Sequence, residues 1–254
     1  MRLVAFCICI LCGAGLVGGL GLASHAERFA INNVSVSGAH ELSTSTLTAA
    51  VETGLQNNIF KIFSRRNMFI YPRREIEQTL VDTFPRIENV EVSRASLLAQ
   101  AVVVTVQERM PFAKWCGKDG ACYLLDDTGF IFAETKESQQ PTTVYVFKGG
   151  LLPNTSPIGQ TFLHGRLLGI VHFLGLLTQA GYSPLGIYVE NEKDFSVPQK
   201  NGPLLLIPFD LKPENMVHDL QLALEADSVR GRETDLEYVD LRFGNRVYYK
   251  FRGE

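Results

Sequence analysis

Few residue patterns in this 254-residue sequence could support chemistry. The triplet Asp127-Thr128-Gly129 matches the short signature of aspartic proteases, whose mechanism needs two carboxylates that share one proton. The sequence holds no second copy, and the triplet lies between two apolar runs, where Asp-x-Gly is ordinary turn chemistry. The histidines are scattered, and no Ser-His-Asp or Cys-His arrangement stands out. We therefore predict no catalytic residue, no cofactor, no metal ion and no enzymatic activity.

Two cysteines, Cys116 and Cys122, enclose a short segment that contains two glycines. In an oxidising compartment such a loop could close into a disulfide, and two free thiols are the alternative. Two cysteines alone do not complete a four-ligand zinc site, and no histidine is near them in sequence. We favour the disulfide.

The charge balance gives no reason to expect nucleic acid as a partner. The net charge is −3 and the isoelectric point is about 6.0, so no basic excess is available to neutralise phosphates. The one basic cluster consists of Arg65, Arg66, Arg73 and Arg74. It could face anionic headgroups of a lipid bilayer, but a solvated face or a recruitment surface for another protein is the interpretation that we favour. No small-molecule substrate is indicated.

The N-terminus suggests how the chain is placed. Leu3 to Ala23 is an uncharged, mostly apolar run, long enough as a helix to cross a hydrocarbon core of about 30 Å. We predict a short cytoplasmic tip and transmembrane anchor over 1–28, with the N-terminus in the cytoplasm because of Arg2. The alternative is a cleaved secretory signal, because Ser24-His25-Ala26 fits a cleavage pattern.

Residues 29–108 are predicted to form an α+β domain in the order strand, helix, helix, strand, strand. The alternation of Val102, Val104 and Val106 is typical of a strand with one buried face. The expected elements are a strand over 31–37, helices that begin after Ser43 and at Pro72, and a hairpin of strands over 87–95 and 101–108.

Residues 109–254 are predicted to form a β-rich α+β domain. The expected elements are a hairpin around residues 127–129, strands over 143–147, 185–189 and 204–209, helices over 162–180 and from Pro213, and a final ribbon of strands over 236–243 and 246–251. In that ribbon, simple alternation places Val239, Leu241 and Phe243 on one face and Tyr238, Asp240 and Arg242 on the other.

Several motifs, taken together in order, resemble the FtsQ/DivIB family of bacterial cell-division proteins. They are FAINNVSVSGAHELS, YPRREIEQTL, FPRIENVEVSR, VVVTVQERMPFAKW, LLDDTGFIF and LEYVDLRFGNRVYYK, and they cover roughly residues 29–250. The first four resemble the POTRA module of that family, and the last two resemble its β domain. The short stretch ahead of the apolar run and the Cys116/Cys122 loop depart from the family pattern.

The resemblance implies a scaffold of the division machinery that links assembly at the division site to septal peptidoglycan synthesis through protein contacts. It implies a single-pass protein of the cell inner membrane with its bulk in the periplasm at the division septum. The implied partners are bitopic proteins similar to FtsB and FtsL, other division proteins and the lipid bilayer. By position, the family's partner contacts fall on Tyr238, Arg242, Phe243, Asn245 and Val247.

Three alternatives are also compatible with the sequence. Phe243 could be a core residue and Arg242 a solvated charge. The chain could be another POTRA-bearing protein of outer-membrane assembly or secretion, although those proteins usually carry several such modules. It could also be a cleaved, soluble periplasmic binding module.

Overall fold

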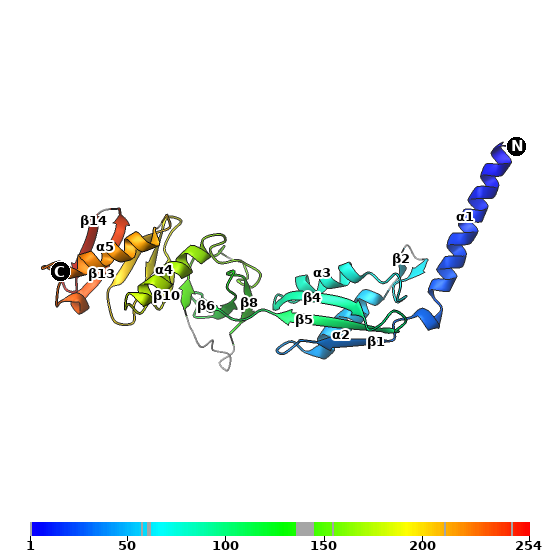
Figure 1. The fold of residues 1–254 in the computed structure, drawn as a ribbon, viewed down its shortest axis with the longest axis horizontal. Helices are drawn as coiled ribbons and strands as arrows, with labels where there is room; N and C mark the ends of the chain where they lie inside the picture. Colours follow the sequence, from blue (N-terminus) through cyan, green and yellow to red (C-terminus); the bar gives the residue numbers. More distant parts are fainter. Residues whose placement is uncertain are drawn as a thin grey trace. The chain divides into compact units, whose positions relative to one another are not determined.

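A computed structural model of the chain describes residues 2–56, 58–59, 62–135, 145–153, 155–210, 212–244 and 246–254 (Figure 1). These residues form an α+β protein that divides into two compact units, Met1–Arg109 (unit 1) and Met110–Glu254 (unit 2). Each unit has its own hydrophobic core.

Unit 1 contains a three-stranded sheet in the order β1-β5-β4, in which β1 is parallel and β4 antiparallel to β5. Its helices are α1 (Arg2–Ser24), α2 (Thr44–Leu55) and α3 (Arg73–Thr83), with a short 3-10 turn η1 (Glu27–Phe29). Its strands are β1 (Asn33–Ser37), β4 (Ile87–Arg94) and β5 (Ala101–Glu108), and the two-residue strands β2 (Asn58–Ile59) and β3 (Phe63–Ser64) pair separately.

The core of unit 1 lies between α2, α3 and one face of this sheet. Leu47 and Val51 from α2 and Leu80 from α3 are fully buried with the alternating valines of β4 and β5. The turn after β1 depends on Gly38, which has φ +80° and whose Cβ, if it had one, would lie 2.1 Å from the carbonyl oxygen of Val106. Only glycine fits this turn, because any side chain would collide with the main chain of β5.

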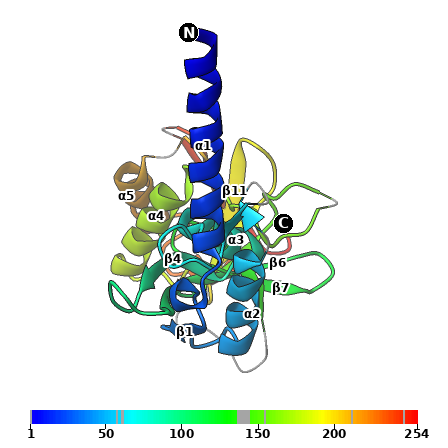
Figure 2. The ribbon, with the colours of Figure 1, turned by 90° about the vertical axis from the view of Figure 1, so that its right-hand side faces the viewer.

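The predicted transmembrane anchor is wrong. Within the described part of the chain, no helix combines the length and the apolarity needed to cross a membrane. Residues 2–24 do form the single helix α1 (Figure 2), but five of them are glycines, which add no apolar side chain. The last turn of α1 also makes polar contacts, because buried Ser24 accepts a hydrogen bond from the amide of Ser64 at 3.0 Å and Asn67 donates to the Ser24 carbonyl at 3.0 Å. Because it depends on this anchor, the predicted single-pass placement in the inner membrane, with a cytoplasmic N-terminus and a periplasmic bulk, is not supported either.

Unit 2 is built on a nine-stranded mixed sheet in the order β14-β13-β12-β11-β10-β9-β6-β7-β8. The strands are β6 (Ala113–Cys116), β7 (Cys122–Leu125), β8 (Ile131–Glu134), β9 (Val146–Lys148), β10 (Gly186–Val189), β11 (Asp194–Val197), β12 (Leu204–Pro208), β13 (Leu236–Phe243) and β14 (Arg246–Phe251). The helices are α4 (Leu167–Gln179) and α5 (Pro213–Glu225), with a 3-10 turn η2 (Glu233–Asp235) before β13.

Helices α4 and α5 lie side by side over the sheet (Figures 1 and 2) and bury its inner face. Helix α4 begins five residues later than the periodicity predicts, because Leu163 has φ +48° and Gly165 has φ +73°, which keep this stretch out of the helix. Gly186 has φ +147°, and a Cβ there would lie 2.0 Å from the carbonyl oxygen of Val146 on the parallel neighbour β9. This close approach of two backbones requires glycine.

Candidate protein-binding edge

The hairpin of β13 and β14 forms one edge of the nine-stranded sheet. Strand β13 is parallel to β12 on one side and antiparallel to β14 on the other, whereas in the described residues β14 pairs with β13 alone. The outer side of β14 therefore presents main-chain groups that can pair with a strand from another chain.

Phe243 is an exposed residue and not a core residue. The pairing of β13 with β14 shifts in register between Asp240 and Phe243, and this irregularity breaks the alternation that would have placed Phe243 beside Val239 and Leu241. Val239 and Leu241 are buried, whereas Phe243 is 56% exposed. Its ring meets the half-exposed ring of Tyr248 edge to face, with centroids 5.1 Å apart. The predicted face pattern is therefore wrong at this residue.

Arg242 is held by two carboxylates, Asp240 on its own strand β13 and Asp194 on β11. It donates to Asp240 from Nε at 2.9 Å and from Nη2 at 2.6 Å, and its Nη1 lies 3.4 Å from Asp194 of β11. Burial alone would raise the pKa of the Asp240 carboxyl, but the hydrogen bonds and charge of Arg242 outweigh burial and lower that pKa. The same hydrogen bonds raise the pKa of Arg242. Arg242 thus reaches across β12 and links β13 to β11, while about a third of its side chain remains exposed.

The other predicted contact residues of the hairpin differ in exposure. Tyr238 and Val247 are half-buried, and Val247 packs against the core of unit 2. Asn245 lies outside the described residues. Tyr248 and Tyr249 were not predicted, yet they are 48% and 37% exposed, and the Tyr249 hydroxyl donates to Ser228 at 2.8 Å. Their aromatic character was the signal available in the sequence, since exposed tyrosines are frequent at protein interfaces.

Comparison with family models and with curated proteins does not assign this edge. No protein-family model matches the sequence, and no curated protein matches it. A function for this edge is therefore inferred from the hairpin itself and from the motifs of the sequence.

The four arginines of the basic cluster have different surroundings. Arg65 forms an ion pair with Glu75 at 2.5 Å, and Arg73 bonds Glu77 at 2.8 Å and Glu91 at 3.3 Å. Arg66 donates to the carbonyl of Ile31, at 3.3 Å from Nε and 3.2 Å from Nη2, and so ties its loop to the residues before β1. Arg74 is exposed and shares a surface hollow with Tyr71 and Glu77. Because carboxylates neutralise Arg65 and Arg73, this face is mixed in charge and not strongly basic.

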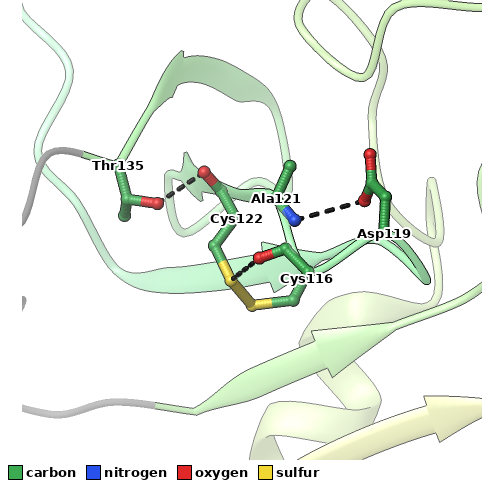
Figure 3. The surroundings of a disulfide bond; sticks show 6 residues. Cys116, Asp119, Ala121, Cys122 and Thr135 are labelled. Carbon is green, nitrogen blue, oxygen red and sulfur yellow. Dashed lines mark hydrogen bonds between the residues drawn. A yellow bond between two sulfur atoms is a disulfide. The ribbon is translucent and has the colours of Figure 1, made fainter.

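Cys116 and Cys122 form a disulfide across the β6–β7 hairpin (Figure 3). The two residues are directly opposite in the antiparallel register, and their Cα atoms are 4.1 Å apart. The Thr135 hydroxyl donates to the Cys122 carbonyl, and the amide of Ala121 donates to Asp119 within the loop at 3.2 Å. The bond therefore closes the tip of one hairpin and links no distant parts of unit 2.

The aspartate triplet is a turn. The buried Asp126, one residue earlier, accepts hydrogen bonds from the amide and hydroxyl of Thr128 and from the amide of Phe130, at 2.6–3.0 Å. Gly129 completes this turn with φ +87°. Among the described residues, no group of three or more histidine, cysteine, aspartate or glutamate side chains is arranged to hold a metal ion.

The Glu108-Arg109 pair from the quoted motifs lies at the end of β5 and holds two loops of unit 1. The Glu108 carboxylate accepts the backbone amides of His40 at 2.8 Å, Leu42 at 3.0 Å and Glu41 at 3.0 and 3.2 Å. Arg109 donates from Nε to the carbonyl of Pro85 at 3.1 Å. No pattern in the sequence indicates that this carboxylate organises the start of α2.

Proposed function

We propose that the chain is a scaffold protein of the bacterial division machinery, related to FtsQ/DivIB, which acts by binding other proteins and not by catalysis. The observation that carries this proposal is the edge strand β14 with exposed aromatic residues on and beside it. Main-chain pairing along such an edge supplies affinity, and the side chains on alternate faces supply selectivity.

The partners that we propose are proteins similar to FtsB and FtsL, together with other division proteins. Two features support binding at this edge. The Asp194–Arg242–Asp240 network holds β13 in place, so a partner strand would meet an ordered hairpin. Phe243 and Tyr248 meet edge to face beside the open edge and offer an aromatic anchor of the kind that dominates binding energy at interfaces.

The experiment is co-purification of the full chain with tagged FtsB- and FtsL-like proteins from the same cells, with Phe243→Ala as the test variant. We expect this variant to bind at least about 30-fold more weakly, because an anchoring aromatic commonly contributes more than about 2 kcal/mol. Leu168→Ala is the matched control, because Leu168 is also an exposed apolar residue, 81% exposed on α4, away from the edge.

Equal binding by wild type, Phe243→Ala and Leu168→Ala would contradict the proposed edge. Normal division after depletion of the protein would contradict the proposed role in division. We expect Leu168→Ala to bind the partner proteins as wild type does and Phe243→Ala to lose binding.

A further inference from the structure

One end of unit 1 carries large apolar side chains that face solvent. Leu97 and Leu98, in the turn between β4 and β5, are each 77% exposed, and Phe69, in the loop before α3, is 56% exposed. The turn is fixed in place, because Gln100 donates to the carbonyl of Glu27 at 2.6 Å and Arg94 donates to the carbonyl of Leu97 at 3.1 Å. These leucines therefore protrude on an ordered turn.

Two guanidinium groups and two phenyl rings form a continuous row beside this turn. The Arg28 guanidinium lies 4.6 Å from the centroid of Phe29, whose ring meets that of Phe69 edge to face at 5.7 Å. The Arg94 guanidinium lies 5.7 Å from the centroid of Phe69. We call Arg28, Phe29, Phe69, Arg94, Leu97 and Leu98 the cationic–aromatic end of unit 1.

Positive charge exceeds negative charge at this end in the part of unit 1 that the structure describes. Of the carboxylates nearest in sequence, Glu91 pairs with Arg73 at 3.3 Å, whereas Glu27 lies at this end, where its main-chain carbonyl accepts a hydrogen bond from Gln100. No ion pair joins Arg28 or Arg94 to a carboxylate among the described residues. Positive charge and protruding apolar side chains therefore occur together.

We propose that the cationic–aromatic end binds the surface of an anionic lipid bilayer. Leucine and phenylalanine side chains gain free energy by entering the boundary between headgroups and acyl chains, and guanidinium groups gain it by meeting lipid phosphates. A protruding turn suits a flat bilayer, whereas a partner helix would need a groove. This contact lies at the surface of the bilayer, involves no crossing segment, and is independent of the proposed function of β14.

The test places a fluorescent reporter in the turn of the full chain. Leu98→Trp is mixed with vesicles of phosphatidylglycerol and phosphatidylcholine, or of phosphatidylcholine alone, each with a fraction of brominated lipid that quenches nearby tryptophan. The signal of wild type, whose one tryptophan is Trp115, is subtracted. Leu168→Trp, at an equally exposed leucine of unit 2, is the control.

We expect quenching of Leu98→Trp by anionic vesicles, little quenching by neutral vesicles, and none specific to Leu168→Trp. Adding Arg28→Gln and Arg94→Gln should weaken vesicle binding about 30-fold, since each arginine near such a surface contributes a factor of about five. Circular dichroism checks that the substituted chain is folded. The proposal is overturned by no quenching at position 98, by equal quenching in neutral vesicles, or by binding that is insensitive to the loss of both arginines.

Discussion

The carboxylate of Glu108 should contribute measurably to the stability of unit 1. It accepts hydrogen bonds from three consecutive backbone amides that precede α2, those of His40, Glu41 and Leu42. A hydrogen bond to a charged group contributes about 1.5–3 kcal/mol, and a bond between neutral groups about 0.5–1.5 kcal/mol. Glu108→Gln keeps one acceptor oxygen but loses the charge, and Glu108 is partly solvated. We therefore expect a loss of about 2 kcal/mol in the free energy of unfolding.

The pH dependence of this contribution has a definite sign. Burial alone would raise the pKa of Glu108, but the hydrogen bonds from Leu42, His40 and Glu41 outweigh burial and lower it. A carboxyl whose pKa is lower in the folded state stabilises the fold fully above its unfolded pKa, about 4.3, and loses that contribution as the pH falls through the folded pKa. The difference between wild type and Glu108→Gln should therefore be constant near neutral pH and shrink in acid below about pH 4.

The assay is chemical unfolding of the full chain, combined with amide hydrogen exchange measured residue by residue. In Glu108→Gln the amides of residues 40–42 should exchange about 30-fold faster, if the loss acts on local opening. Glu88→Gln is the control, because Glu88 is an exposed carboxylate on the neighbouring strand that accepts one side-chain bond from Gln107. Unchanged exchange at residues 40–42, or equal effects of the two variants, would refute the reasoning.

Three further predictions concern other positions. Gly38→Ala should destabilise unit 1 by at least about 2 kcal/mol in chemical unfolding, because the added methyl collides with main chain at a positive φ; an unchanged midpoint would contradict this. Asp240→Asn should lower the thermal unfolding midpoint of unit 2 and loosen the β13–β14 hairpin, because Arg242 then has a neutral partner at position 240. Unchanged chemical shifts of β14 residues in nuclear magnetic resonance spectra would contradict this prediction. The double variant Cys116→Ser with Cys122→Ser should lower stability by about 2 kcal/mol, because the closed loop is short; a larger loss by calorimetry would show that the bond does more than restrict the unfolded chain.

Much of the fold follows from periodicity and turn chemistry. The valines of β4 and β5 alternate cleanly, and α3 begins directly after Pro72, as predicted for these residues. Strands β6 and β11 were not predicted, because Ala113–Cys116 and Asp194–Val197 are too short to show alternation. Whether such a short segment forms a strand is decided by its pairing with neighbouring strands and not by its own sequence alone.

The candidate site was harder to predict than the fold around it. The position of the terminal hairpin was correct, but the register shift before Phe243 reverses the face of that side chain, and a one-residue change of register moves every later side chain to the other face. The partners of Arg242 could not be predicted, because Asp194 is distant in sequence. The transmembrane anchor was predicted from the length of an uncharged run. Length alone overestimates the apolarity of a helix that is rich in glycine.

Three positions together define a sequence pattern that could identify relatives. They are Gly38 and Gly186, where the backbone requires glycine, and Glu108, whose carboxylate holds the start of α2. A Cβ atom at these glycines would lie 2.1 or 2.0 Å from a main-chain oxygen, and no movement of a flexible side chain can relieve that collision. The surrounding residues can therefore be substituted, whereas these glycines cannot. Distant homologues with the same fold should keep this spacing. It places one glycine 70 residues before the glutamate that ends β5 and another glycine 78 residues after that glutamate. Searches by structure-derived spacing could thus reach proteins that whole-sequence comparison does not.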